Sequence, residues 1–280
     1  MRADQRARRD AFLSRIGTRP VVMGVLNVTP DSFSDGGLFQ SPDAAVAHAG
    51  KMIGEGADII DVGAESTRPG AFTVSEADEL ARLEPVVTAL AQRDTALSVD
   101  TSKAYVAARA IALGAIMIND VWGLQRDPAM AETVAASEAA VVIMHNREEK
   151  NRALDIVADM RRFFDRSLAL AARARIPDER IILDPGIGFA KTSQQNIEAV
   201  RRLGELHDYG RPILVGVSRK KFLGQWIGNG AEGERAGTIA ACLAAAAAGA
   251  SLFRVHDVAE HVAALQVFQA IRGVTSAGNP

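Results

Sequence analysis

The sequence of 280 residues predicts an α/β protein that folds as a single TIM (β/α)8 barrel. Short runs rich in β-branched residues alternate with longer segments of helical periodicity, which is typical of βα units around a parallel sheet. Eight such units in about 250 residues match the size of this barrel, and most of the runs end in a polar residue. The predicted strands are 21–27, 58–63, 96–100, 116–120, 140–145, 181–184, 213–218 and 252–257.

Two of the intervening segments show the helical pattern plainly. Between Ser75 and Arg93, apolar residues recur every three or four positions, and Ser75 is a suitable N-cap. The segment from Asp155 to Arg175 repeats the pattern. No linker rich in Ser, Gly or Pro divides the chain. We therefore expect one barrel over residues 21–275, preceded by an N-terminal surface segment over residues 1–20 that forms a short helix.

The main alternative is an open, doubly wound sheet. Such a sheet normally carries a GxGxxG turn after its first strand, whereas this first strand runs into NVTPDSFSDGG. A barrel also explains the polar strand ends, because all carboxyl ends of its strands converge on one face. These residues are Asn27, Asp61, Asp100, Asn119, His145, Asp184, Ser218 and His256.

Composition excludes several classes of function. Lys plus Arg number 32 and Asp plus Glu number 34, a net charge of −2, so no basic excess exists for nucleic-acid binding. The single cysteine, Cys242, excludes an intrachain disulfide framework and a multi-cysteine metal site. No run of eighteen uncharged apolar residues occurs, so we expect a cytoplasmic protein that does not span a membrane.

The predicted barrel mouth suggests a binding site for a polar ring and a phosphate. Asp100, Asn119 and Asp184 offer two carboxylates and an amide, which suit a flat heterocycle with an amide edge and an exocyclic amine. The same oxygens could instead bind a hard divalent ion. Arg254 and His256 end the eighth strand, where TIM barrels often bind phosphate. The alternative for Arg254 is an ion pair with a neighbouring acid.

The segments after the first, second and seventh strands add to this mouth. Lys220 follows the seventh strand directly, and we expect its side chain to face the pocket. The segments NVTPDSFSDGGLF and GAESTRPGA are rich in Gly, Pro, Ser and Asp, and loops of this kind above a barrel mouth often act as lids.

Seven motifs in this order and spacing resemble the signature of the dihydropteroate synthase family. The resemblance extends from about Val21 to Ile271. The motifs are NVTPDSFSDGG (27–37), ESTRPG (65–70), SVDTSK (98–103), IND (118–120), LDPGIGFAK (183–191), SRK (218–220) and RVHDV (254–258).

The resemblance implies a TIM barrel that condenses 6-hydroxymethyl-7,8-dihydropterin pyrophosphate with p-aminobenzoate, releasing pyrophosphate, in folate biosynthesis. It assigns the pterin to Asp100, Asn119, Asp184, Gly216 and Lys220. It assigns the pyrophosphate to Arg254 and His256, and the Mg²⁺ that neutralises this group to Asn27. It assigns the p-aminobenzoate pocket to Phe33, Thr67, Arg68, Pro69, Phe189 and Ser218.

The chemistry of these substrates predicts a dissociative substitution. The enzyme mainly has to stabilise the leaving pyrophosphate and a developing pterin cation, and Asp35 on the first loop is placed to face that cation. We expect inhibition by sulfonamides, because the ESTRPGAF loop carries no insertion. Lys221 stands where the family commonly has a small serine; it either pairs with the p-aminobenzoate carboxylate or points to solvent.

Two other functions stay open. A methyltransferase acting on methyltetrahydrofolate and a corrinoid protein would keep Asp100, Asn119 and Asp184 but would not need the pyrophosphate residues or the two lid loops. A non-catalytic paralogue would bind a pterin without condensing it. The family resemblance also favours a homodimer, which the sequence alone does not decide.

Overall fold

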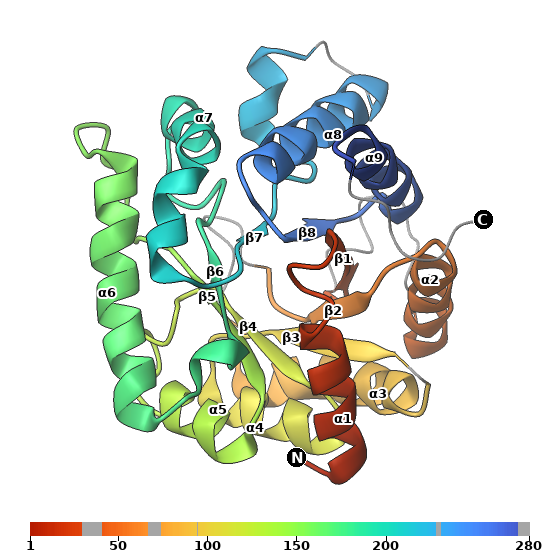
Figure 1. Ribbon diagram of the computed structural model, residues 1–280. Coiled ribbons are helices and arrows are strands. Elements are labelled where there is room, and N and C mark those ends of the chain that lie inside the picture. Colours follow the sequence, from red (N-terminus) through yellow and green to blue (C-terminus); the bar gives the residue numbers. More distant parts are fainter. Residues whose placement is uncertain (30–40, 67–73, 94, 228–230, 274–280) are drawn as a thin grey trace.

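Eight parallel strands form a ring at the centre of the molecule (Figure 1). The computed structural model describes residues 1–29, 41–66, 74–93, 95–227 and 231–273. The strands follow one another around the ring in the order β6-β5-β4-β3-β2-β1-β8-β7. They are β1 (Val21–Asn27), β2 (Ile59–Gly63), β3 (Ala96–Asp100), β4 (Met117–Asp120), β5 (Ala140–Met144), β6 (Ile181–Asp184), β7 (Leu214–Val215) and β8 (Leu252–Val255).

The ring closes between β6 and β7. Leu183 forms an isolated parallel bridge with Ile213, and its amide donates a hydrogen bond to the Pro212 carbonyl at 3.0 Å. Every strand of the sheet therefore has a neighbour on both sides, which is the arrangement of a barrel and not of an open sheet. The predicted TIM barrel is confirmed.

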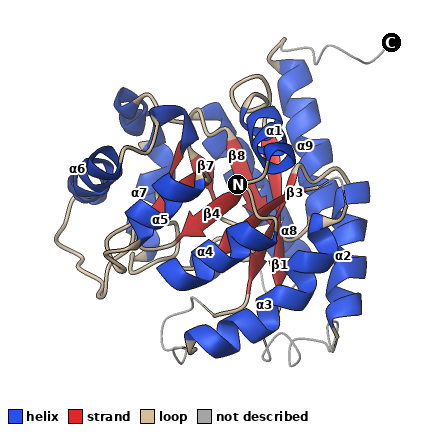
Figure 2. Ribbon diagram, turned by 90° about the horizontal axis from the view of Figure 1, so that it is seen from below, coloured by secondary structure: helices blue, strands red, loops and turns tan. Residues whose placement is uncertain are grey.

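Helices surround the strands as an outer layer (Figure 2). The two helices predicted from their apolar spacing begin where expected: the Ser75 hydroxyl accepts from the Asp78 amide at 3.1 Å, and the Asp155 carboxylate accepts from the Val157 and Ala158 amides at 2.9 Å. The helices are α1 (Ala3–Leu13), α2 (Pro42–Gly54), α3 (Glu76–Ala91), α4 (Ala104–Leu113), α5 (Met130–Ser137), α6 (Ile156–Ala174), α7 (Ser193–Arg201), α8 (Ala231–Ala247) and α9 (Val258–Ile271).

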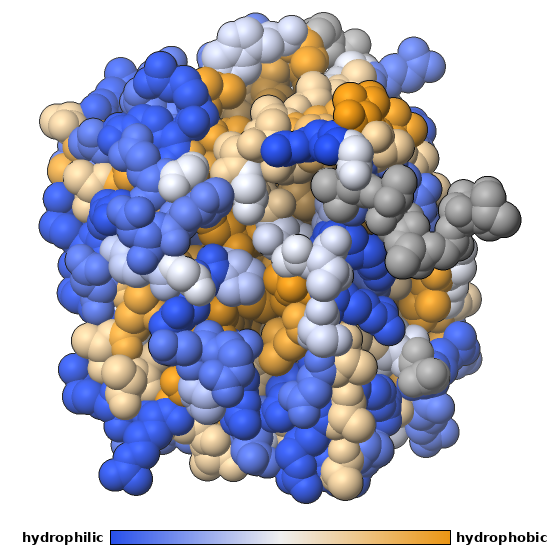
Figure 3. All heavy atoms as spheres, in the orientation of Figure 1, coloured by the Kyte–Doolittle hydropathy of each residue, from blue (hydrophilic) through white to orange (hydrophobic). Residues whose placement is uncertain are grey.

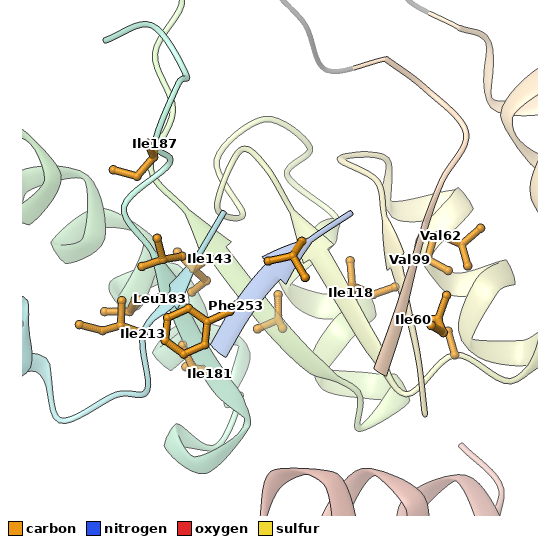
Figure 4. Packing of buried hydrophobic residues seen from close by; sticks show 14 of the residues in the cluster. Ile60, Val62, Val99, Ile118, Ile143, Ile181, Leu183, Ile187, Ile213 and Phe253 are labelled. Carbon is orange, nitrogen blue, oxygen red and sulfur yellow. The ribbon is translucent and has the colours of Figure 1, made fainter. Parts of the chain in front are cut away.

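Alternate residues of each strand point to opposite sides of the barrel wall. The outward residues, such as Ile60, Val62 and Val99, belong to one large core between strands and helices (Figure 4). The inward residues near the amino ends of the strands, such as Val21 and Ile59, form a second, smaller core inside the ring. Inward positions nearer the carboxyl ends include the buried polar residues Asp61, Asp100 and Asn119, so the candidate site lies at that end.

Helix α1 closes the amino end of the barrel. Its Phe12 is buried in the inner core, and the Gln5 side-chain amide donates to the Ile111 carbonyl at 2.8 Å. The expected N-terminal helix therefore exists, but one face of it is buried. Figure 3 shows hydrophilic residues over most of the face on which α1 lies, with hydrophobic atoms in the hollow toward its centre.

Strand β7 is shorter than predicted. The expected strand over 213–218 pairs with β8 only at Leu214 and Val215. Beyond that point the Ser218 hydroxyl accepts from the His256 amide at 3.2 Å, so a side-chain contact takes the place of the backbone hydrogen bonds.

Among the described residues, no helix is both long and apolar enough to cross a membrane.

Candidate active site

The strand register gathers polar side chains at the carboxyl end of the barrel. Gly63 of β2 lies opposite Asp100 of β3, and Asp100 lies opposite Asn119 of β4. Asp184 ends β6, and Arg254 lies on β8. Strand ends that are far apart in the sequence thus lie together at one end of the ring, as expected for a TIM barrel.

Arg254 joins three of the strands at this end. Its Nε donates to Asp61 Oδ2 at 2.7 Å, and its Nη2 donates to Asp100 Oδ2 at 2.9 Å. The Asn119 amide donates to the same Asp61 oxygen at 3.0 Å. The ion pair with neighbouring acids, which was the alternative expectation for Arg254, is therefore present in the structure. The Arg254 side chain is 20% exposed, whereas Asp61 is fully buried, so Arg254 lies at the edge of the cluster.

Asp61 is the residue of this cluster to which the sequence assigned no role. It is fully buried on β2 and accepts hydrogen bonds from both Asn119 and Arg254. The available signal was a carboxylate inside the apolar strand IIDVG, because a charge buried in this way requires partners. Asp61 orients the Asn119 amide so that its nitrogen points to Asp61 and its oxygen stays an acceptor.

Several acceptors in this cluster lack a hydrogen-bond partner among the described residues. They are Asp61 Oδ1, Asp100 Oδ1 and Asn119 Oδ1, and all three are buried. A buried acceptor without a donor destabilises the protein by about 1–3 kcal/mol, so such atoms commonly mark a functional site. Together they suit a ligand that presents N–H groups.

The carboxylates of the site are hard to ionise. Burial raises the pKa of Asp100 to about 7; Arg254 opposes this increase, and the charge of Asp61 adds to it. Burial also raises the pKa of Asp184 to about 6, against the hydrogen bond from the Gly186 amide to Asp184 Oδ1 at 2.7 Å. Burial would lower the pKa of Arg254, but the charges of Asp61 and Asp100 raise it above its usual value. Perturbed carboxylates around one cation are typical of a functional site.

Lys220 lies against the segment that follows β6. Its Nζ is 4.4 Å from the centre of the Phe189 ring, a cation–π contact. A side chain at Gly188 would begin 3.0 Å from the Lys220 stem, and Gly188 has a φ of +90°, so glycine lets the two segments approach. Lys221 follows at the start of a 3-10 helix (Lys221–Gln225), and its side chain is exposed.

His256 directly follows β8 and contacts Ser218, which lies three residues after β7. The imidazole Nδ1 lies 3.0 Å from the Ser218 hydroxyl. Burial, followed by the positive charges of Arg219 and Arg254, lowers the pKa of His256 to about 3, so the ring is neutral at pH 7. Arg219 itself pairs with Asp257 at 2.7 Å and is half exposed.

The remaining predicted residues lie at the rim or outside the described part. Asn27 is exposed at the carboxyl end of β1, and a side chain at Gly63 would begin 3.7 Å from its Oδ1. A side chain at Gly216 would begin 3.7 Å from Arg254 Cβ. Phe33, Asp35, Thr67, Arg68 and Pro69 lie outside the described residues.

Comparison with known proteins identifies the family. A family model described as pterin binding enzyme matches residues 23–256. The curated dihydropteroate synthase of Clostridium beijerinckii is 46% identical over 251 residues, which cover 88% of this chain and 92% of that protein. This chain belongs to the dihydropteroate synthase family. It is therefore an enzyme, a transferase of folate biosynthesis.

Solved structures of dihydropteroate synthases have the same fold. The Xanthomonas albilineans enzyme with 4-aminobenzoic acid superimposes with a TM-score of 0.87 at 45% identity, covering 92% of this chain and 94% of that one. The Yersinia pestis enzyme in a complex with a sulfonamide drug gives a TM-score of 0.86 at 44% identity, covering 93% and 96%. The resemblance found in the motifs is thus confirmed for the family and the barrel.

Proposed function

We propose that this enzyme condenses 6-hydroxymethyl-7,8-dihydropterin pyrophosphate with p-aminobenzoate to give 7,8-dihydropteroate and pyrophosphate. One observation carries the proposal: buried acceptors of Asp100 and Asn119 without partners lie beside the Arg254 guanidinium, at the edge of the same cluster. A substrate with hydrogen-bond donors at one end and an anion at the other matches this arrangement. Membership of the synthase family supports it.

The pterin would bind between Asp100, Asn119 and Asp184. Its exocyclic amine and ring N–H groups would donate to the two carboxylates, and its amide edge would lie along Asn119. Each hydrogen bond to a charged group contributes about 1.5–3 kcal/mol. Lys220 would contact the ring from the side of Phe189, and Gly216 would leave room for the ring beside β7.

The pyrophosphate would bind at the outer edge of this cluster. Arg254 would exchange its contact with Asp100 for the phosphate oxygens when the pterin supplies donors to Asp100. His256 is neutral at pH 7 and can share a proton with the anion, because its Nδ1 is already held by Ser218. Both residues would therefore stabilise the charge that develops on the leaving group.

Mg²⁺ would enter this site as a companion of the substrate. Among the described residues, no group of three or more His, Cys, Asp or Glu side chains could hold a metal ion. Mg²⁺ usually takes one or two protein oxygens and completes its shell with water and substrate phosphates, and the exposed Asn27 amide offers such an oxygen. When bound there, Mg²⁺ would neutralise charge on the leaving pyrophosphate.

p-Aminobenzoate would lie over Phe189 and Ser218, with Thr67, Arg68, Pro69 and Phe33 from the two loops completing the pocket. The exposed Lys221 is then available to the carboxylate at the rim. Sulfonamides share the aniline group and a negatively charged end, so we expect them to compete for this pocket. The amine needs positioning more than activation, because an aniline is already neutral at pH 7.

Asp35 would stabilise the pterin cation in a dissociative reaction. Asp35→Ala should therefore lower the single-turnover rate of C–O bond cleavage by about 100-fold, because a missing electrostatic partner of a transition-state charge has effects of this order. Rapid quench of excess enzyme mixed with the pterin pyrophosphate, Mg²⁺ and p-aminobenzoate measures this rate. An unchanged rate would show that another group carries the role.

The proposed reaction is tested by pyrophosphate release from purified protein given the pterin pyrophosphate and Mg²⁺, with and without p-aminobenzoate. We expect release together with dihydropteroate only when p-aminobenzoate is present, and competition by sulfamethoxazole. Tight pterin binding without either product would favour the non-catalytic paralogue or the methyltransferase. Two further expectations accompany the proposal: a homodimer, which analytical ultracentrifugation tests, and a cytoplasmic location, which cell fractionation tests.

A further inference from the structure

A second buried polar network lies behind the segment that follows β6. At its centre is Lys191, which is 2% exposed. Its Nζ lies 2.7 Å from the Gly186 carbonyl, 2.8 Å from His145 Nδ1 and 3.3 Å from the Phe189 carbonyl. No part of the proposed reaction uses this lysine, although burying an amine of this kind is costly without partners.

The partners determine the protonation of the network. His145 Nε2 lies 3.1 Å from Asp159 Oδ2, so the ring donates from Nε2 to the carboxylate and accepts at Nδ1 from Lys191. Burial, followed by the charge of Lys191, lowers the pKa of His145 to about 4. The hydrogen bond from His145 lowers the pKa of Asp159 to about 2. The imidazole is therefore neutral and connects an anion to Lys191.

The protonation state of Lys191 follows from the same contacts. Burial lowers its pKa, and the charge of Asp184 opposes this effect. Its neighbours are the carbonyl oxygens of Gly186, Phe189 and, at 3.5 Å, His145, which can only accept hydrogen bonds, and the acceptor side of the His145 ring. Acceptors alone surround the nitrogen, and the ammonium offers them the largest number of N–H donors, three.

The network holds residues 186–189 tightly. A side chain at Gly186 would begin 2.0 Å from the His145 carbonyl, and this residue has a φ of +63°, so the segment touches the end of β5. Ile187 is buried in the outer core (Figure 4). The Phe189 carbonyl accepts from Lys191, and its ring faces Lys220. Among the described residues, Lys191 is the side chain that donates to both Gly186 and Phe189. Asn196 Oδ1 accepts from the Gly188 amide between them at 2.7 Å.

We propose that Lys191, oriented by His145 and Asp159, is a positioning residue for the p-aminobenzoate side of the site. The inference rests on the proposed function for the identity of the ligand. The pterin side of the site should depend less on Lys191. Asp100, Asn119 and Asp184 lie on strands that backbone hydrogen bonds to neighbouring strands hold in place. Phe189 stands on a segment without a ladder. Loss of the lysine should therefore affect the two substrates unequally.

Lys191→Met removes the cation and keeps most of the volume. We expect the KM for p-aminobenzoate to rise about 10-fold, because displacement of Phe189 affects this ligand directly. The KM for the pterin pyrophosphate should rise by a smaller factor, about 3-fold, because Lys220 packs on Phe189. The pterin side is also affected because, against the effect of burial, the charge of Lys191 lowers the pKa of Asp184.

Asp159→Asn keeps Lys191 but weakens its orientation through His145. It also weakens the ion pairs of Asp159 to Arg147 and Arg162. It should show the same imbalance at smaller size. Asp159→Asn also tests the proposal if Lys191→Met does not fold.

The matched control is Arg162→Gln. Arg162 binds the same Asp159 carboxylate at 3.1 Å, but through Oδ1 and not through the Oδ2 that faces His145, and it is 56% exposed. We expect both KM values to equal those of the wild type. Equal changes in the two KM values of the Lys191 and Asp159 variants, or unchanged values with only a lower Tm, would overturn the positioning role.

Amide hydrogen exchange separates this inference from the proposed function. Residues 186–190 should exchange at least about 10-fold faster in Lys191→Met than in the wild type, whether or not the protein forms dihydropteroate. Unchanged exchange would overturn the inference even if the wild type is active. A wild type that forms no dihydropteroate, with faster exchange in the variant, would refute the proposed function and leave the structural role of Lys191 supported.

Discussion

Arg254→Met should both unfold more easily and lose most of its activity. Removal of the guanidinium leaves Asp61 and Asp100 buried without a cation, and breaking a buried pair in this way destabilises a protein by about 3–5 kcal/mol. Turnover should fall at least about 100-fold, because the leaving pyrophosphate loses its main positive partner. Urea unfolding and steady-state pyrophosphate release measure the two effects.

Arg219→Met is the matched control for stability. Arg219 lies near the same mouth and pairs with Asp257, but it is 54% exposed, so its loss should lower the free energy of unfolding by less than about 1 kcal/mol. Adding Asp61→Asn to Arg254→Met should restore part of the stability, since it removes one uncompensated charge. If Arg254→Met is as stable as Arg219→Met, the buried cluster is not held by charge pairing.

Asp184→Asn should weaken pterin binding while making the protein more stable above pH 7. The amide keeps an oxygen that can accept from Gly186 but replaces a charged acceptor for the pterin, so affinity should fall about 10- to 100-fold. The free energy of unfolding should rise by about 1–3 kcal/mol, because the buried carboxylate no longer has to ionise. Calorimetric titration with the pterin and urea unfolding at pH 8 measure these changes.

The pH dependence of this difference has a definite sign. The pKa of Asp184 is about 6 in the folded protein and 3.8 in the unfolded chain, so the folded state binds the proton more tightly. The carboxyl group therefore stabilises the wild type below about pH 4, and this contribution is lost as the pH rises through 6. The wild type and Asp184→Asn should differ little at pH 4 and most above pH 7. A difference that grows toward acid pH would contradict the assigned burial effect.

Much of the fold could be predicted because its signals are local and repeated. The inward and outward alternation of each strand and the N-caps at Ser75 and Asp155 are readable in short windows. The end of β7 could not be predicted in this way, because beyond Val215 the chain contacts its neighbour through the Ser218 hydroxyl and the His256 amide, which are 38 residues apart. Contacts of this range leave no periodic trace in the sequence.

The site shows the same limit. Asp100, Asn119, Asp184 and Arg254 could be placed together because the barrel brings strand ends to one face. The role of Asp61 could not, because it depends on which acid the Arg254 guanidinium reaches across the ring. Lys191 is the last residue of the motif LDPGIGFAK, and the sequence does not show that its side chain is buried beside His145.

The burial of Phe12 under the strands means that the two ends of this barrel can evolve separately. Residues of the inner core and α1 support folding and lie on the side opposite to the mouth, so stabilising replacements there leave the chemistry untouched. A lineage under drug selection could thus change the mouth, accept a loss of stability, and recover it through replacements beneath the barrel. Replacements that cause resistance and replacements that restore stability would then lie at opposite ends of the barrel.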